Sequence, residues 1–240
     1  MKITILDTEC ASLKGKVVQI ANIVTDENLS EIKESRCTLV NPLCKIGYGA
    51  MGIHFIRDEH VKDAPKFEDI AQEYIPTEGY LVAHNAPFDV RILEDEGYTL
   101  PEGVKVLDTL ELARELVHKN TCENHKLGTL YHYYKAYEDM DDYDGQAHDA
   151  LYDCHLLFYT LKRMLAQHDL TLDEAYALIN TPIQDKPCDM KKYRDSGKTW
   201  TEVYEEAPDY CQWLLDNYDF KYHKFGKELK AWLESVLEVK

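Results

Sequence analysis

The chain lacks the features of a membrane or secreted protein. Its 240 residues contain no uninterrupted apolar run of about 18 residues, so the sequence predicts no membrane span. The opening stretch, MKITILDTEC, has neither the long apolar core nor the small-residue cleavage site of a signal peptide. We therefore expect a cytoplasmic protein with no membrane partner.

Paired cysteine motifs are also missing. The seven cysteines are scattered and odd in number, and no CxxC pair occurs. Neither a zinc knuckle nor a disulfide framework is indicated, because both need cysteines at characteristic spacings. We expect reduced and mostly buried thiols.

Positive charge is scarce, with 27 Lys and Arg against 44 Asp and Glu and a net charge of −17. This balance argues against a tight, non-specific grip on nucleic acid, because a phosphate chain would be repelled. It does not exclude an enzyme that touches phosphates through bound metal ions, since such cations reverse the local sign of the field.

One acidic run, EDMDDYD (138–144), raises the possibility of a calcium-binding loop. Aligning Gly145 with the glycine of such a loop places Met140 first and Leu151 last, where acidic ligands are required. A calcium-binding protein is therefore not supported. The run is predicted to be a solvated loop near His148.

The apolar pattern that is present predicts an α/β fold. Strands are expected at 2–7, 16–24, 31–40, 79–85 and 104–109. Helices are expected at 66–75, 87–97, 109–118, about 126–136 and 148–165. The stretch with Gly47, Gly49 and Gly52 is expected to be a loop. Three strands followed by alternating helices and strands indicate a mixed five-stranded sheet flanked by helices.

Three regions follow from the same pattern. Residues 1–167 form the main domain, and 168–188 form a linker with a short helix, since TPIQDKPCD carries two prolines. Residues 189–240 form a small, mainly helical module.

The first candidate site residues are the acids of ILDTEC. Residues i and i+2 of a strand face the same side, so Asp7 and Glu9 project together. Two close carboxylates repel unless something neutralises them, and a divalent cation is the simplest partner. For these two residues alone, a solvated loop remains the alternative.

Two further segments supply acids and a histidine. In AHNAPFD, a turn at Asn85 delivers Asp89 to the first turn of a helix, where an acid could also simply favour the helix dipole. In AHDALYD, His148 and Asp153 are five residues apart, a rotation of about 140° on a helix. His148 is therefore expected in the first turn or in the loop before it, reaching over the site.

Taken together and in this order, the contexts DxE, HNxxFD and HxAxxD resemble the DEDDh superfamily of 3′–5′ exonucleases, which includes polymerase proofreading subunits. The resemblance covers about 1–167 and implies a ribonuclease H-like fold. NPLCKIGYGAMGIHFI, YLVAHNAPFDVRIL and AHDALYDCHLL resemble the exodeoxyribonuclease X branch of that family. The tail from 189 resembles that branch's C-terminal module, although MKKYRDSGK stands in place of its usual Gly-Lys-Tyr.

The resemblance implies catalysis by two Mg²⁺ ions, with Mn²⁺ as a substitute. It implies that Asp7 bridges both ions, that Glu9 and Asp153 complete the first, and that Asp89 supports the second. It also implies that His148 takes a proton from the attacking water.

Substrate contacts are implied in the same way. The family holds the 3′-terminal nucleotide through residues that correspond to Thr8, Cys10, Met51, His54 and Phe88. Asn85 is more simply explained as organising its turn, although it stands beside these residues. Phe88 could equally be a core residue.

The leading interpretation is a metal-dependent 3′–5′ exonuclease that releases nucleoside monophosphates from DNA with a free 3′ end. An RNA-trimming exoribonuclease and a catalytically silent binding or scaffold protein are the alternatives. Polymerase or repair proteins are possible partners, and the oligomeric state stays open. In the tail, Lys191, Lys192, Arg194 and Lys198 lie near Tyr193 and Trp200, a mixture that can bind single strands or build a small core.

Overall fold

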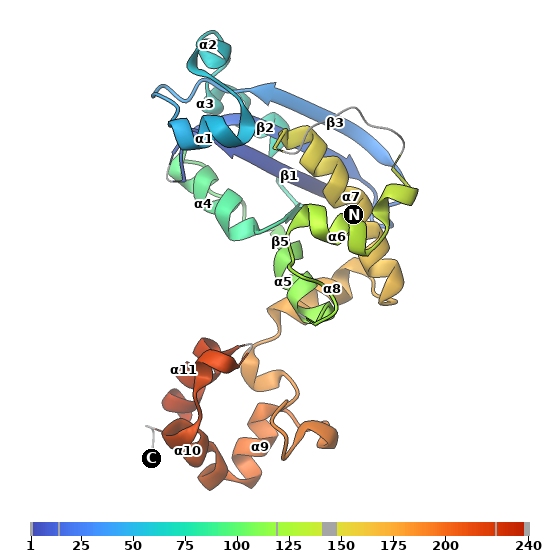
Figure 1. Cartoon of the computed structure of the whole chain (residues 1–240), viewed down its shortest axis with the longest axis vertical. Helices are drawn as coiled ribbons and strands as arrows, with labels where there is room; N and C mark the ends of the chain where they lie inside the picture. The colour runs from blue at the N-terminus through green and yellow to red at the C-terminus, as the bar shows by residue number, and fades with distance from the viewer. Residues whose placement is uncertain (1, 14, 119, 141–147, 224, 238–240) are drawn as a thin grey trace. The chain divides into compact units, whose positions relative to one another are not determined.

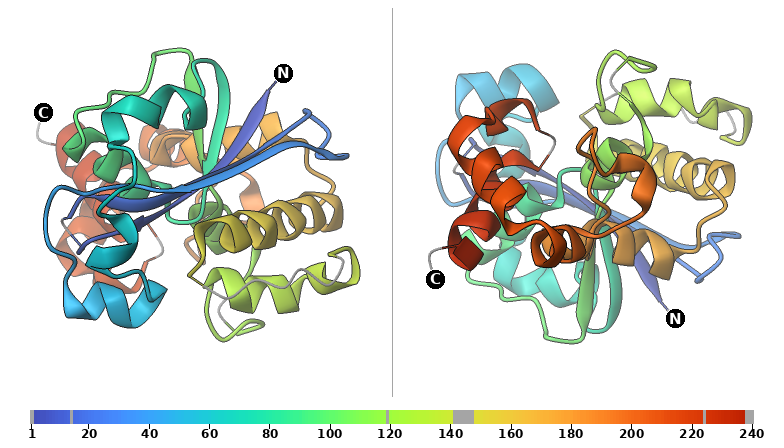
Figure 2. Two further views of the ribbon diagram at one scale, coloured as in Figure 1. Left: turned by 90° about the horizontal axis from the view of Figure 1, so that it is seen from above. Right: turned by 90° about the horizontal axis from the view of Figure 1, so that it is seen from below.

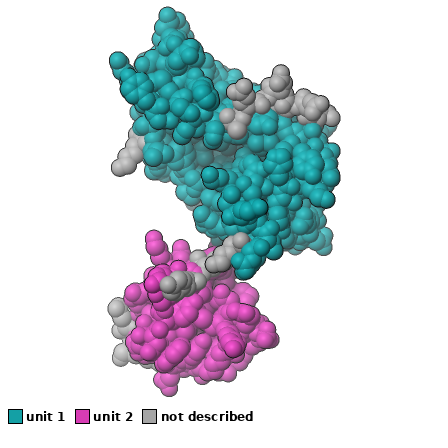
Figure 3. All heavy atoms as spheres, in the orientation of Figure 1, with its two compact units in different colours: residues 1–179 teal, residues 180–240 magenta. Residues whose placement is uncertain are grey.

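The computed structural model describes residues 2–13, 15–118, 120–140, 148–223 and 225–237 (Figure 1). Part of the acidic run, from residue 141 onward, lies outside these ranges. The chain forms two compact units, residues 1–179 and 180–240, which are coloured separately in Figure 3.

Unit 1 is built on a mixed five-stranded sheet, as the sequence predicts. Its strands are β1 (Ile3–Cys10), β2 (Val17–Thr25), β3 (Ile32–Leu39), β4 (Gly79–Ala83) and β5 (Val104–Asp108). The spatial order is β3-β2-β1-β4-β5. The first three strands are antiparallel, whereas β4 runs parallel to both β1 and β5. This arrangement makes β1 the central strand.

Eight α-helices complete the described part of unit 1. They are α1 (Tyr48–His54), α2 (Asp58–Val61), α3 (Phe67–Tyr74), α4 (Ala86–Asp95), α5 (Thr109–Leu116), α6 (Leu127–Tyr133), α7 (Ala150–Gln167) and α8 (Leu172–Asn180). A 3₁₀ turn, η1 (Ala136–Glu138), follows α6. No described helix is long and apolar enough to cross a membrane.

The sheet separates two layers of core, which Figure 2 shows with α7 and α4 on opposite sides of the strands. Ile3 and Ile5 of β1 pack with α7 in one cluster, and Leu6 packs with α3 and α4 in another. This alternation is the pattern that a strand with two buried faces requires. One stripe of α7 (Ala150, Cys154, Leu157, Leu161, Leu165) is buried throughout, which agrees with the apolar spacing behind the helix expected at 148–165.

The expected loop around Gly47–Gly52 is instead helix α1. Glycine disfavours helix, but here burial outweighs that preference. Ile46 and Ile56 flank α1 and are buried with Val61, while Met51 packs against the same cluster. The helix ends at Phe55, whose φ of 57° is left-handed.

The boundary of unit 1 lies later than the expected 167. Leu172 and Ala175 of α8 are buried in the same core as α7. The Tyr80 hydroxyl also donates to Asp173 at 2.5 Å. Residues 168–179, expected to be part of a linker, therefore belong to unit 1.

Unit 2 is mainly helical, as expected. It contains α9 (Trp200–Glu206), α10 (Pro208–Asn217) and α11 (Gly226–Leu237), with short 3₁₀ turns η2 (Ile183–Asp185), η3 (Arg194–Ser196) and η4 (Phe220–Tyr222). Its core is formed by Trp200, Val203, Leu214, Leu229 and Leu233. Trp200 is only 1% exposed, so this tryptophan serves packing.

The role of α8 can be tested with Leu172→Ala in the full chain. Because Leu172 is 5% exposed within the unit 1 core, its truncation should lower the free energy of unfolding by about 2–4 kcal/mol. Leu43→Ala, at a residue that is 69% exposed, is the control and should change it by less than about 0.5 kcal/mol. Equal denaturation midpoints for the two variants would show that α8 does not stabilise unit 1 and belongs to the linker.

Candidate active site

Three consecutive residues at the end of the central strand β1 begin the candidate site. Because side chains alternate, Asp7 and Glu9 share the face of Ile3 and Ile5, toward α7, and Thr8 points to the other face. Both acids are half-buried, whereas Thr8 is buried. The strand therefore presents two carboxyl groups side by side.

A third acid comes from the turn between β4 and α4. Asn85 adopts a left-handed φ of 70°, which reverses the chain just before the helix. Asp89, 3% exposed, lies in the first turn and accepts a hydrogen bond from Thr8 Oγ1 at 2.7 Å. The turn is held by Asp108, whose Oδ1 accepts from the Asn85 amide at 2.9 Å.

The last two residues come from the start of α7. His148 has a φ of 67° and lies directly before Asp149, which caps the helix. Its backbone amide donates to Asp153 Oδ2 at 3.2 Å, which ties the histidine to the first turn. One possible ligand atom from each of Glu9, His148 and Asp153 lies within 4.8 Å of the others.

The carboxyl groups perturb one another strongly. Burial, followed by repulsion from Asp89 and Asp153, raises the pKa of Asp7 well above its usual range. Burial and then Asp153 raise the pKa of Glu9 to about 8. Burial also raises the pKa of Asp89 to about 7, although the bond from Thr8 opposes the shift. Ionising all these carboxyl groups at neutral pH is therefore energetically unfavourable unless a positive charge is added.

This set of donors suits a hard divalent cation. Carboxylate oxygens are the ligands that Mg²⁺ and similar ions prefer, and positive charge is what the acids lack. Metal-ligating acids in a protein without bound cation are expected to hold protons instead, as the raised pKa values of Glu9 and Asp89 indicate.

Comparison with known proteins shows which family the chain belongs to. Residues 4–161 match the RNase T exonuclease family. The chain belongs to this exonuclease family. It is 32% identical to exodeoxyribonuclease 10 of Escherichia coli over 234 residues, which cover 97% of this chain and 99% of that protein. It is also 30% identical to the DNA polymerase III subunit epsilon of Rickettsia typhi over 166 residues, 64% of this chain and 69% of that protein.

A solved structure agrees with these matches. "Exonuclease X in complex with 5′ overhanging duplex DNA" superposes with a TM-score of 0.62 at 29% identity, covering 74% of this chain and 99% of that one. The predicted ribonuclease H-like exonuclease fold is therefore confirmed. Metal dependence is typical of the exonuclease family.

Three of the expected substrate residues have side chains engaged within the protein. Thr8 holds Asp89, as described above. The Cys10 thiol is 7% exposed, and burial raises its pKa to about 12. His54 Nε2 lies 3.2 Å from the Cys10 carbonyl oxygen, and its Nδ1 accepts from the Ile56 amide at 3.0 Å. Within the candidate site, they connect the end of β1 to α4 and α1.

The other three expected substrate residues retain accessible surface. Met51 is half-buried on α1, and Asn85 is exposed at the left-handed turn. Phe88 is half-buried against the α3–α4 core, with the Arg91 guanidinium carbon 5.2 Å from its ring centroid. Phe88 thus packs against the core and also keeps part of its ring accessible.

Two residues outside the expected set support the candidate site. Gln19 of β2 accepts from the Ala150 amide at 3.1 Å and donates to Asp149 at 3.2 Å. Asp149 in turn accepts from the amides of Leu151 and Tyr152. This bridge fixes the start of α7, next to His148. Its sequence signal was a lone glutamine within the apolar run KVVQIANIV.

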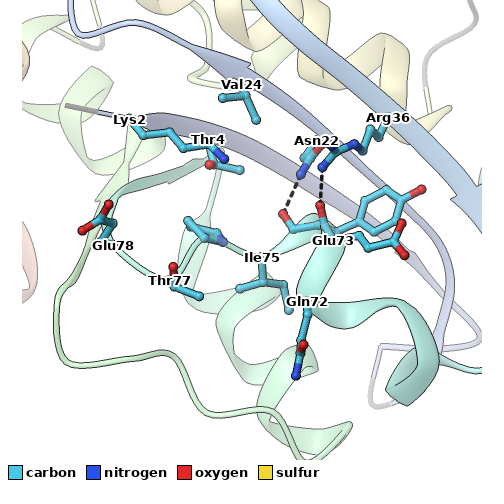
Figure 4. A pocket seen from close by; sticks show the side chains of 12 residues that line it. Lys2, Thr4, Asn22, Val24, Arg36, Gln72, Glu73, Ile75, Thr77 and Glu78 are labelled. Carbon is cyan, nitrogen blue, oxygen red and sulfur yellow. Dashed lines mark hydrogen bonds between the residues drawn. The ribbon is translucent and has the colours of Figure 1, made fainter.

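A cavity of about 210 Å³ lies elsewhere on unit 1 (Figure 4). Asn22 lines it and donates to the Tyr74 carbonyl at 2.6 Å, while its Oδ1 has no partner among the described residues. Because Asn22 pairs with Leu6, it faces the side of the sheet opposite Asp7. The cavity is therefore separate from the carboxylate cluster.

The clustered acids predict a pH dependence of stability without metal. The pKa of Glu9 and that of Asp89 are raised in the folded state, so the folded state binds more protons than the unfolded state. The contribution of these two groups to stability should thus be fully present below about pH 4 and be lost as pH rises toward 8. In EDTA, we expect Tm to drop by several degrees between pH 5 and 8, and Mn²⁺ to restore it.

Asp7→Asn separates this effect from other titrating groups, because it removes one of the repelling charges. In EDTA at pH 8 this variant should melt at least as high as the wild type and gain less from Mn²⁺. A variant that melts lower, or a wild type whose Tm is flat with pH, would contradict the repulsion.

Gln19 can be tested as a positioning residue. Gln19→Ala removes the bridge from β2 to the first turn of α7, so His148 and Asp153 should lose their alignment and turnover should fall by about 10- to 100-fold. Cys37→Ala is the matched control, because it removes the other contact of the Gln19 amide, Nε2 to sulfur at 3.4 Å, and leaves the bonds from Gln19 to Asp149 and Ala150 in place. Equal loss of kcat in both variants, measured below their melting temperatures, would disprove the role.

Proposed function

We propose that the chain is a metal-dependent 3′–5′ exonuclease that hydrolyses DNA from the 3′ end and releases nucleoside monophosphates. One observation carries the proposal: carboxyl groups from α4 and α7 are close enough to those of β1 to raise the pKa values of Asp7 and Glu9 beyond the effect of burial, with His148 beside Glu9 and Asp153. Such a cluster costs stability unless it binds cations, and cations are what a phosphodiester substrate requires.

Each residue has a role that its position supports. Asp7, Glu9 and Asp153 would hold one ion, and Asp7 with Asp89 would hold a second. When bound, two Mg²⁺ ions supply an activated water and neutralise the phosphate charge, and Mn²⁺ can replace them. Thr8 orients Asp89 through its 2.7 Å hydrogen bond.

His148 is the proposed general base. It is exposed and approaches Glu9 and Asp153, so it can accept a proton from a water in the same space. Its backbone amide donates to Asp153, which holds the histidine beside the proposed metal-binding acids.

DNA is the proposed substrate, since the relative that matches 97% of this chain is named an exodeoxyribonuclease. The similar exonuclease X structure holds duplex DNA with a 5′ overhang, which supports nucleic-acid binding by this chain as well. A replicative polymerase is a proposed partner, because another relative is a DNA polymerase III subunit.

The experiment is digestion of single-stranded DNA labelled at either end, in Mg²⁺, Mn²⁺ or EDTA. The 3′ label should be released first as a mononucleotide, the 5′-labelled strand should shorten stepwise, and EDTA should stop both reactions. Asp7→Asn, which keeps the shape of the side chain, should lower the rate by about 10³-fold or more.

Glu94→Gln is the control, because it removes an equal charge from the exposed surface of α4. It should cleave like the wild type. A rate that survives in EDTA, or an unaffected Asp7→Asn variant, would refute the metal mechanism. A matched RNA strand cleaved faster than DNA would reassign the substrate to RNA.

A further inference from the structure

Unit 2 carries a cluster of stacked aromatic rings beneath a lysine, which we call the Trp213 platform (Lys192, Tyr193, Tyr210 and Trp213). The rings of Tyr210 and Trp213 are stacked, with centroids 6.2 Å apart and planes inclined by 12°. Lys192 Nζ lies 4.7 Å from the Tyr210 centroid and 5.0 Å from that of Tyr193. A cation and π-faces are thus combined in one place.

Packing does not account for Trp213. Its side chain is 54% exposed on α10, whereas Trp200 is 1% exposed at the centre of the unit 2 core. Tyr193 is buried and Tyr210 is partly buried against that core, so they anchor the stack from beneath. A large aromatic ring that is held by its neighbours yet open to solvent has the form of a binding surface.

The cations next to the platform are available. Within the described ranges, no carboxylate lies at ion-pair distance from Lys191, Lys192 or Arg194, while Lys198 is paired with Glu206. Arg194 donates to the Asp189 carbonyl at 3.1 Å, and its charge helps to lower the pKa of the Asp189 carboxyl without forming an ion pair with it. The side chains of Lys191, Lys192 and Arg194 can therefore bind a phosphate group without first breaking an ion pair.

The charge of the chain is divided unequally between the units. Unit 1 contains 17 Lys and Arg against 32 Asp and Glu, and unit 2 contains 10 against 12. Away from its metal ions, unit 1 repels a polyanion, while unit 2 is almost neutral. A strand that unit 1 is to cleave therefore needs attraction from another surface.

We propose that the Trp213 platform binds single-stranded DNA, with a base stacked on the open face of Trp213 and phosphates beside Lys192 and Arg194. Stacking is tolerant of sequence, because every base has a π-face. The inference rests on the proposed exonuclease function and adds to it a second contact with the strand, away from the reacting bond. Asp209 and Asp216 also lie on α10, so phosphate contact comes from the 191–194 segment.

The test measures binding of a fluorescent 20-nucleotide oligothymidylate to the full chain in EDTA, where cleavage is stopped. Trp213→Ala should raise Kd by about 5- to 150-fold, the range for loss of one stacked base. Lys192→Ala should weaken binding and lower the salt dependence, whereas Lys227→Ala, at an exposed lysine of α11, should have a smaller effect.

A second readout does not need a truncated side chain. Oligothymidylate should quench the tryptophan emission of the wild type, and Trp213→Phe should lose most of that quenching while keeping much of the affinity. Equal Kd values for the wild type and Trp213→Ala, or equal weakening by Lys192→Ala and Lys227→Ala, would overturn the platform.

A small substrate keeps this test distinct from that of the exonuclease function. The p-nitrophenyl ester of thymidine 5′-monophosphate offers one nucleotide and no strand, so Trp213→Ala should hydrolyse it at the wild-type rate. If the wild type cleaves neither this ester nor DNA, the exonuclease proposal fails, and binding in EDTA still decides the platform.

Discussion

The structure of unit 1 depends on holding like charges together at one end of its central strand. Asp7 and Glu9 share a face of β1, and Asp89 and Asp153 approach from two helices. Burial, followed by repulsion from Asp89 and Asp153, raises the pKa values of Asp7 and Glu9. Repulsion of this kind would spread the elements apart if they were loosely attached. Hydrogen bonds from uncharged donors oppose this repulsion. The Thr8 hydroxyl donates to Asp89, and the His148 backbone amide donates to Asp153.

The surrounding fold explains why these attachments are firm. The central strand is hydrogen-bonded on both sides, antiparallel to β2 and parallel to β4, and both of its faces are covered by apolar clusters. A strand in that position cannot slip by one residue without turning its whole buried set around. The same register that buries Ile3 and Ile5 therefore fixes the direction of Asp7 and Glu9.

Sequence reasoning predicted the parts that depend on local periodicity. The five strands and helix α7 could be predicted because alternation and helical spacing are visible in neighbouring residues. Helix α1 was missed because its glycines argue for a loop, and only the distant partners in its cluster stabilise it. The Gln19 bridge joins residues 130 positions apart, so no local pattern could reveal it. The inward direction of His54 was hidden for the same reason.

The origin of the four acids along the chain has a consequence for how activity arises. Asp7, Asp89 and Asp153 come from segments separated by long stretches of sequence, and the last of them stands on α7, which packs against β1 and β2. A partly folded or nascent chain therefore lacks the whole set. The carboxylate cluster is therefore a product of the completed fold, assembled only when the early strands and the late helix of unit 1 have come together.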